Sequence, residues 1–420
     1  MIVEIINTGN ELMLGRVLNS HQQWLCRQLA DRGYVVTRQV AIADAVGEIQ
    51  GAVRESLSRA DLVITTGGLG PTSDDLTRDA IAQLLGKTLH EDTSVLAQIE
   101  KFFAQRGRPM PASTRTEAQV PEGATVLPNH FGTAPGLAME VPSGKFREAN
   151  HSGWLVMLPG PPRELRPMFL EFAWPVIQSA FPAPDAFVCR TFHTTDIGES
   201  TVQEMIESAM QPLVNAGMEL GYCARPGQVD VRCVVCGAKA FEQIGVAEKL
   251  LRERLGESIY AQDEESMEEG IIRVLTERRQ TLALAESCTG GCIAHRLTNV
   301  PGASAVLLGG FVTYSNQMKQ QTIGVQSRTL AEHGAVSEPV AREMAEGARR
   351  ITGSDFAISV TGIAGPSGGS AEKPVGTVFI ALAGPSGTEV WKRVNAWDRE
   401  TFKDVTAQQA LNFLRIALAR

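Results

Sequence analysis

A serine follows a short apolar run in the last third of the chain, within the sequence Glu286-Ser287-Cys288-Thr289-Gly290-Gly291. Residues 281–285 predict a buried strand and residues 293–297 predict a helix, so we expect Ser287 on the turn between them. A serine on such a turn can attack a bound group, while the amides that follow it stabilise an oxyanion. These residue types therefore indicate nucleophilic catalysis.

The expected serine nucleophile needs a base that accepts its proton. His295 is expected on the following helix and His333 in a loop, which gives little support to a Ser-His-Asp triad. Tyr314 and Lys319 follow another predicted strand, and a lysine with a lowered pKa can act as the base. We therefore expect Ser287 to act with Lys319 and Tyr314. Each residue alone has a structural alternative, as a helix cap, a solvated charge or a strand-end packing residue.

Glycine-rich loops accompany this serine. Residues 361–369 and 373–377 adjoin predicted strands and are suited to a phosphate or ribose pocket. Arg399 opens the last predicted helix and can hold a phosphate through two hydrogen bonds, although an exposed surface role is an equal alternative. Cys288 is a rival nucleophile, but neighbouring side chains usually point in different directions and most such thiols are structural.

A second group of chemically suited residues lies near the amino terminus. Residues 62–66 predict a buried strand that leads into Gly67-Gly68-Leu69-Gly70-Pro71-Thr72-Ser73-Asp74-Asp75. Glycines let the backbone approach a ligand, and helix amides favour phosphate. Two carboxylates would repel a phosphate unless a divalent cation lay between them, which predicts a metal-bridged pyrophosphate. In the alternative, one aspartate only caps the next helix.

The elements around these residues predict three domains, at residues 1–178, 179–262 and 263–420. The first alternates strands and helices, which favours a doubly wound parallel sheet with its ligand at the carboxyl ends of the strands. Glu11 follows the first strand and is therefore expected at the same edge as Asp74. The second domain reads as a small α+β module, and the third again mixes strands with helices.

The composition is that of an ordinary globular protein, with 43% apolar and 20% charged residues among 420, which excludes collagenous, disordered and coiled-coil classes. The net charge of −8 gives no support to nonspecific binding of nucleic acid. Seven scattered cysteines favour reduced thiols, and Cys233 and Cys236 are expected on opposite faces of one strand. No apolar run reaches membrane-spanning length and no basic leader is recognised, so we expect a cytoplasmic protein without a membrane partner.

Three amino-terminal motifs together resemble the CinA family, namely residues 67–75, 132–136 and 158–164. The resemblance implies a molybdopterin-binding-like fold and an ADP-ribose pyrophosphatase activity that requires a divalent metal. It implies that the nucleotide or its phosphates are bound by Gly67, Gly68, Gly70, Thr72 and Ser73, and the metal by Asp74, Asp75 and Glu11. Two alternatives are a pterin- or nucleotide-binding module without catalysis, and a regulatory protein linked to competence.

Five carboxy-terminal motifs closely resemble the CinA amidohydrolase domain: residues 285–291, 310–316, 334–337, 361–366 and 373–377. This resemblance implies hydrolysis of nicotinamide mononucleotide (NMN) to nicotinate mononucleotide and ammonia, without a cofactor. Ser287 would attack the carboxamide carbon, and Lys319 would move the proton with help from Tyr314. The resemblance also implies a KH-like connector, a homodimer, and substrate binding by Ser304, Thr361, Arg399, Gly290 and Gly365.

Overall fold

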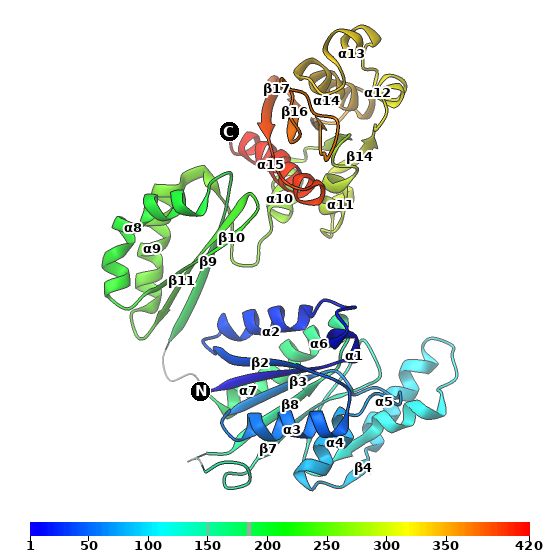
Figure 1. The fold of residues 1–420 in the computed structure, drawn as a ribbon, viewed down its shortest axis with the longest axis vertical. Coiled ribbons are helices and arrows are strands. Elements are labelled where there is room, and N and C mark those ends of the chain that lie inside the picture. Colours follow the sequence, from blue (N-terminus) through cyan, green and yellow to red (C-terminus); the bar gives the residue numbers. More distant parts are fainter. Residues whose placement is uncertain (149–150, 183–185) are drawn as a thin grey trace. The chain divides into compact units, whose positions relative to one another are not determined.

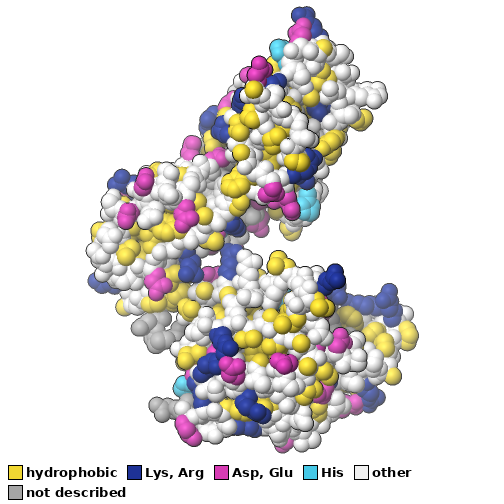
Figure 2. Space-filling model, viewed as in Figure 1, with side chains coloured by type: hydrophobic (Ala, Val, Ile, Leu, Met, Phe, Trp, Pro, Cys, Tyr) yellow, Lys and Arg dark blue, Asp and Glu magenta, His cyan; other side chains and the backbone are white. Residues whose placement is uncertain are grey.

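The computed structural model describes residues 1–148, 151–182 and 186–420, which form two compact units, Met1–Val188 and Cys189–Arg420 (Figure 1). Each unit has its own sheets and hydrophobic cores. None of the helices described is both long and apolar enough to cross a membrane. On the face drawn in Figure 2, Lys and Arg side chains are interspersed with Asp and Glu side chains over both units.

The first unit is built on a six-stranded sheet with the order β2-β1-β3-β8-β7-β6. The four strands β2, β1, β3 and β8 are parallel, which confirms the predicted doubly wound sheet, while β7 and β6 are antiparallel additions at one edge. The strands are β1 (Val3–Thr8), β2 (Val36–Ile42), β3 (Leu62–Thr66), β6 (Thr125–Leu127), β7 (Gly136–Val141) and β8 (Gly153–Leu158). A separate short pair joins β4 (Leu89–Glu91) to β5 (Gln119–Pro121).

Helices cover both faces of this sheet (Figure 1). On one face, α3 buries Ile49, Val53 and Leu57, whose four-residue spacing places them along one side of the helix. The core on this face also receives α4 and α5, and the core on the other face receives α2, α6 and α7. The helices are α1 (Asn10–Met13), α2 (Ser20–Ala30), α3 (Val46–Leu57), α4 (Thr77–Leu85), α5 (Thr93–Ala104), α6 (Pro162–Met168) and α7 (Trp174–Ala180).

The second unit begins with the predicted α+β module, a four-stranded sheet in the order β10-β11-β9-β12 with two helices on one face (Figure 1). Cys233 is buried and Cys236 is exposed, as their separation by three residues along one strand predicts. The elements are β9 (Phe187–Thr195), α8 (Glu199–Asn215), β10 (Glu219–Arg225), β11 (Gln228–Cys236), α9 (Ala240–Leu255) and β12 (Ile259–Gln262).

The rest of this unit contains a five-stranded sheet in the order β14-β13-β15-β16-β17. Its first three strands are parallel to one another. The strand β16 pairs antiparallel with β15, and β17 pairs antiparallel with β16. The strands are β13 (Leu282–Glu286), β14 (Leu307–Val312), β15 (Phe356–Gly362), β16 (Thr377–Gly384) and β17 (Gly387–Val394). Because Glu286 is level with both Val312 and Val360, the carboxyl ends of β13, β14 and β15 meet at one edge.

Six helices pack on the two faces of this sheet. The core on one face receives α10, α11 and α15, and the cores on the other face receive α12, α13 and α14. His333 was expected in a loop, but it is the last residue of α13. The helices are α10 (Met267–Arg278), α11 (Cys292–Thr298), α12 (Asn316–Ile323), α13 (Ser327–His333), α14 (Glu338–Thr352) and α15 (Arg399–Ala419).

Candidate active sites

Ser287 lies on the predicted turn between β13 and α11. Its amide donates to the carbonyl of Val360 (3.0 Å), which ties the turn to β15, and its carbonyl accepts from the amide of Gly290 (3.1 Å). Gly290 and Gly291 have φ of 62° and 96°, a conformation that favours glycine. The serine is 8% exposed, so its hydroxyl is held in a largely water-free place.

Lys319 lies on α12 and reaches the nucleophile from a second element. It is only 1% exposed, and its Nζ lies 3.0 Å from Ser287 Oγ, with the carbonyls of Thr313 at 2.8 Å and Tyr314 at 3.4 Å. Burial lowers the pKa of the Lys319 ammonium. A neutral amine has two N–H groups and one lone pair, so the two carbonyls can accept the N–H groups while the lone pair faces the serine proton. This geometry is that of a serine with a lysine base.

The thiol of Cys288 does not compete with the serine. It is buried, and burial raises its pKa to about 12, so it stays protonated near neutral pH. Because the thiolate is the reactive form of cysteine, Cys288 packs as a small apolar side chain.

Glu286 holds the Ser287 turn in place, a role that the sequence reasoning missed. Its buried carboxylate accepts hydrogen bonds from the amides of Gly291 (3.0 Å), Ile293 (3.1 Å) and Ala294 (2.9 Å), at the start of α11. The amides of Gly290 and Cys292 are also paired within the turn. The amides of residues 290–294 therefore already have partners and do not serve an oxyanion. The amides of Cys288 and Thr289 are the remaining candidates for stabilising it.

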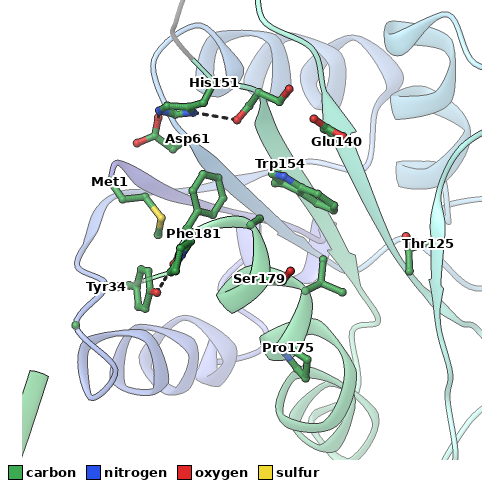
Figure 3. Close-up of a pocket in the computed structure, with 15 residues that line it drawn as sticks. Met1, Tyr34, Asp61, Thr125, Glu140, His151, Trp154, Pro175, Ser179 and Phe181 are labelled. Atoms are coloured by element: carbon green, nitrogen blue, oxygen red, sulfur yellow. Dashed lines mark hydrogen bonds and ion pairs between the residues drawn. The ribbon is translucent and has the colours of Figure 1, made fainter. Parts of the chain in front are cut away.

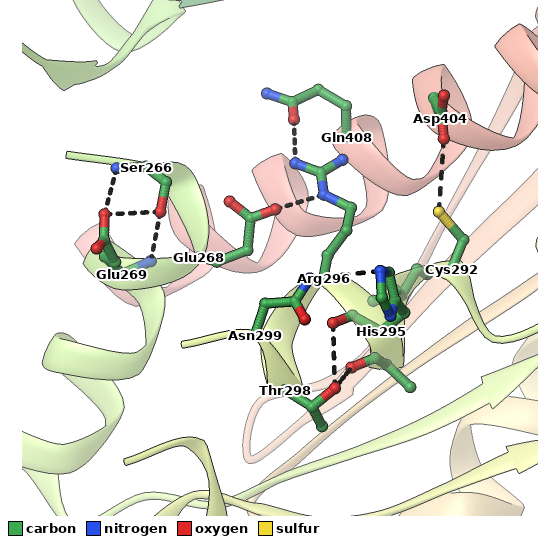
Figure 4. A network of polar contacts seen from close by, with 12 residues as sticks. Ser266, Glu268, Glu269, Cys292, His295, Arg296, Thr298, Asn299, Asp404 and Gln408 are labelled. Carbon is green, nitrogen blue, oxygen red and sulfur yellow. Dashed lines mark hydrogen bonds and ion pairs between the residues drawn. The ribbon is translucent and has the colours of Figure 1, made fainter. Parts of the chain in front are cut away.

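A network of polar side chains fixes the helix that follows the Ser287 turn (Figure 4). Arg296 on α11 donates to Glu268 on α10, and to Gln408 on α15 at 2.6 Å. Cys292 Sγ donates to Asp404 Oδ1, also on α15, at 3.6 Å. These contacts hold α11 between its neighbours and so fix where the turn presents Ser287.

Three of the predicted substrate-binding positions are brought together with Tyr314 near the carboxyl edge. Arg399, in the first turn of α15, donates through Nη1 to the carbonyl of Gly365 (2.9 Å) and through Nη2 to the Tyr314 hydroxyl (2.8 Å). The Tyr314 side chain is 62% exposed, and its hydroxyl contacts this arginine. Thr361 is buried near the end of β15, where its hydroxyl donates to the carbonyl of Ala335.

Ser304 is not brought to this site within one chain. It belongs to a short 3-10 turn, Ala303–Ala305, that precedes β14. The first residue of β14, Leu307, pairs with the first residue of β13, whereas Ser287 follows the last residue of β13. Because the strands are parallel, Ser304 lies at the opposite end of the sheet, where it lines a separate cavity of about 460 Å³.

The glycine loop of the first unit lines a cavity of about 530 Å³ at the carboxyl edge of its sheet. Gly67 and Gly68 have φ of 96° and 66°, and a Cβ on Gly68 would come within 2.1 Å of the Thr77 hydroxyl. A Cβ on Gly70 would come within 2.6 Å of Asp75 Oδ2. Glycine is therefore required for the close packing of this loop, while the predicted binding of phosphate by Gly67, Gly68 and Gly70 stays a prediction.

The aspartates after the loop both line this cavity. Asp75 Oδ2 accepts from the Thr72 amide at 2.9 Å and from the Thr72 hydroxyl. In this structure Thr72 therefore donates to a side chain of the protein itself, while its predicted binding of the nucleotide stays a prediction. Ser73 and Asp74 are exposed. The helix α4 begins after Leu76 without a side-chain cap, so neither aspartate has the capping role given as the alternative.

Glu11 also lines the cavity, together with Asp44, which the sequence reasoning missed. Asp44 follows β2 and accepts from the Asn10 amide at 2.8 Å. Its pKa is raised by burial and by the charges of Glu11, Asp74 and Asp75. The described residues contain no group of three or more acidic, His or Cys side chains already arranged around a metal position. Nevertheless, these four carboxylates suit a hard divalent cation, which would relieve their repulsion.

A second cavity in this unit, of about 1150 Å³, lies at the opposite edge of the sheet (Figure 3). It is lined by residues at the amino ends of the strands, including Asp61 and Trp154. The Tyr34 hydroxyl donates to the carbonyl of Phe181 at 2.5 Å, and His151 lies 3.5 Å from Asp61. This cavity lacks the glycine loop, so the candidate site of the unit remains at the carboxyl edge.

Three family models match consecutive parts of the chain. They are described as "Probable molybdopterin binding domain" for residues 4–179, "Damage-inducible protein CinA KH domain" for residues 189–261 and "CinA C-terminal domain" for residues 264–418. The chain therefore has the three-domain architecture that the sequence motifs predicted.

Full-length relatives carry the same family name. A CinA-like protein of Akkermansia muciniphila is 42% identical over 97% of this chain and 95% of its own length, and one of Synechococcus sp. is 41% identical over 99% and 98%. The crystal structure of the competence/damage inducible protein from Agrobacterium tumefaciens is 43% identical, covers 37% of this chain and 96% of that chain, and has a TM-score of 0.35. The chain belongs to the CinA family.

Proposed function

We propose that the carboxy-terminal domain hydrolyses the carboxamide of NMN to nicotinate mononucleotide and ammonia, in pyridine-nucleotide salvage. The observation that carries this proposal is the buried contact of 3.0 Å between Lys319 Nζ and Ser287 Oγ. A lysine whose pKa is lowered by burial can be neutral when it meets the serine, which activates the hydroxyl. Arg399, which donates to the Tyr314 hydroxyl at 2.8 Å, would bind the nucleotide phosphate, and Tyr314 would assist Lys319, whose Nζ its carbonyl contacts at 3.4 Å.

The reaction proceeds by acyl transfer. Neutral Lys319 accepts the proton of Ser287 while Oγ bonds to the carboxamide carbon, and the amides of Cys288 and Thr289 stabilise the oxyanion. Protonated Lys319 then gives its proton to the amide nitrogen, which leaves as ammonia and leaves an ester on Ser287. Lys319 next takes a proton from water as the water oxygen attacks the ester carbon. It then returns this proton to Ser287 Oγ as the ester bond breaks, which releases nicotinate mononucleotide and restores the neutral lysine.

Ammonia release from NMN by the full chain tests this proposal. Ser287→Ala should abolish the release, whereas Cys288→Ala, which changes the neighbouring buried thiol, should keep it. The proposal fails if Ser287→Ala retains the wild-type rate. Because serine chemistry needs no metal, chelation with EDTA should leave the amidase activity unchanged.

The amino-terminal cavity favours a second activity, cleavage of ADP-ribose to AMP and ribose 5-phosphate. Its support is a loop of three glycines that shares one cavity with six acidic side chains, four of which are suited to a metal. Glu11, Asp44, Asp74 and Asp75 would hold a divalent cation, which would neutralise the charge of the pyrophosphate. Backbone amides of the loop would then donate to the phosphates, while the close packing of Gly67 on Thr8 and of Gly68 on Thr77 would hold the loop in place.

Incubation with ADP-ribose and magnesium distinguishes this activity from the two alternatives. AMP should appear with wild type and be lost with Asp74→Asn or with EDTA. If no AMP forms while Asp74→Asn still weakens nucleotide binding, the domain is a binding module. If the chain neither binds nor hydrolyses NMN or ADP-ribose, a regulatory role linked to competence is favoured. Family resemblance also supports a cytoplasmic homodimer, which sedimentation at several concentrations tests.

A further inference from the structure

Glu117 has no part in the chemistry assigned above, yet it lines the same cavity as the glycine loop. It lies in the 3-10 helix Ala112–Ala118, between α5 and β5. The side chain is 2% exposed, and its Oε2 is buried without a hydrogen-bond partner among the described residues. An unpaired buried polar atom is destabilising, so it requires an explanation, and a ligand in the adjoining cavity provides one.

The neighbouring glutamate, Glu164, is already satisfied. Its Oε2 accepts from Asn129 Nδ2 at 2.9 Å. A Cβ on Gly132 would come within 2.0 Å of that oxygen, so the glycine makes room for the carboxylate. Glu164 is thus held by the protein, while Glu117 keeps an oxygen for another donor.

Glu117 is also suited electrostatically to a neutral donor. Burial raises its pKa to about 7, against a hydrogen bond from Thr133 that lowers it, and the charges of Glu164 and Asp75 raise it further. A phosphate placed here would face the carboxyls of Glu117, Glu164 and Asp75, whose charge the nearby Arg78 offsets only in part. A hydroxyl brings no charge and can donate to the unpaired oxygen.

We propose that Glu117 accepts a hydrogen bond from a ribose hydroxyl of the nucleotide in this cavity. The inference rests on the proposed amino-terminal function, which supplies a ligand with phosphates for the glycine loop and riboses on both sides. Carboxylates bind ribose diols in other nucleotide sites for the same reason, because each hydroxyl donates to a strong acceptor. Glu117 would then distinguish ribose from its deoxy counterparts.

Equilibrium binding to the full chain tests this role without relying on turnover. The probes are AMP, 2′,3′-dideoxy-AMP and ribose 5-phosphate, titrated with magnesium present, and the variants are Glu117→Leu and the exposed control Glu122→Gln. Glu117→Leu should weaken the binding of AMP or of ribose 5-phosphate by about tenfold, as expected for one lost hydrogen bond to a carboxyl group. The binding of dideoxy-AMP should not change. The probe that weakens identifies which ribose is bound.

Thermal unfolding provides the second readout. Glu117→Leu loses the hydrogen bond from Thr133 but also removes a buried carboxyl with one unpaired oxygen, so the variant should be about as stable as wild type, whereas loss of a purely structural group would lower the midpoint. Equal weakening of all three probes, or no weakening, would overturn the inference. If wild type binds AMP in this diol-dependent way but does not cleave ADP-ribose, the pyrophosphatase proposal fails and the ribose contact stands. If wild type cleaves ADP-ribose and Glu117→Leu binds every probe normally, the pyrophosphatase proposal stands and the ribose contact fails.

Discussion

Replacement of Lys319 by methionine separates its role as a base from its role in packing. Methionine keeps the unbranched chain but removes the amine that lies 3.0 Å from Ser287 Oγ. Loss of a positioned general base typically slows catalysis by about 10²–10⁴-fold, or about 3–5 kcal/mol of barrier. The carbonyls of Thr313 and Tyr314 lose a donor, at about 1–3 kcal/mol for each group left unpaired, but relief from burying an amine offsets part of this.

The pH dependence makes this prediction specific. Because burial lowers the folded-state pKa of Lys319, wild-type kcat/KM should rise with pH up to that lowered pKa and then level off. Between the lowered pKa and the unfolded value near 10.4, unfolding takes up a proton, so the free energy of unfolding of the wild type rises with pH. Lys319→Met should lose both effects.

Ammonia release and chemical denaturation, each measured from pH 6 to about 10.5, check these expectations. Lys392→Met, which changes an exposed lysine on β17, is the matched control and should behave as wild type. A Lys319→Met variant that kept more than about a tenth of the activity, or the same rising pH limb, would refute the assignment of Lys319 as base.

Three further substitutions test other contacts. Arg399→Lys should raise KM for NMN by about tenfold with a smaller change in kcat, because lysine cannot make the forked contact to a phosphate; an unchanged KM would contradict this. Glu286→Gln should destabilise the domain by about 2 kcal/mol in denaturant titration, because an amide replaces one oxygen that accepts from the α11 amides. Cys288→Ser should retain ammonia release, and its loss would reopen the case for the thiol as nucleophile.

The sequence predicted best where local pattern alone decides the structure. Residues 62–66 form β3 as predicted, because a run rich in β-branched residues ends at two glycines, which adopt positive φ and turn the chain out of the strand. The turn at Ser287 was predicted from the change from strand to helix periodicity. Lys319 was chosen as its partner because it follows another predicted strand and because the histidines of this domain were poorly placed to act as base. The proximity of Ser287 and Lys319 is confirmed, while their catalytic roles remain predictions.

The remaining features depend on tertiary paths that local pattern does not contain. The antiparallel β7 was missed because strand direction depends on how the chain returns to the sheet. Glu286 was treated as a flanking residue, since its capping contacts exist only once α11 starts beside it. Ser304 was assigned to the substrate site by family resemblance, although the register of β14 places it at the other end of the sheet.

The position of the proposed base depends on backbone carbonyls that follow an edge strand of the sheet. Lys319 Nζ is anchored by the carbonyls of Thr313 and Tyr314, directly after β14, and within the described part of the chain β14 is an edge strand bonded to β13 alone. Edge strands with one bonded neighbour fray before the strands inside a sheet. Fraying here would withdraw the amine from Ser287 while the core stays folded, so reversible heat inactivation of the amidase should precede global melting.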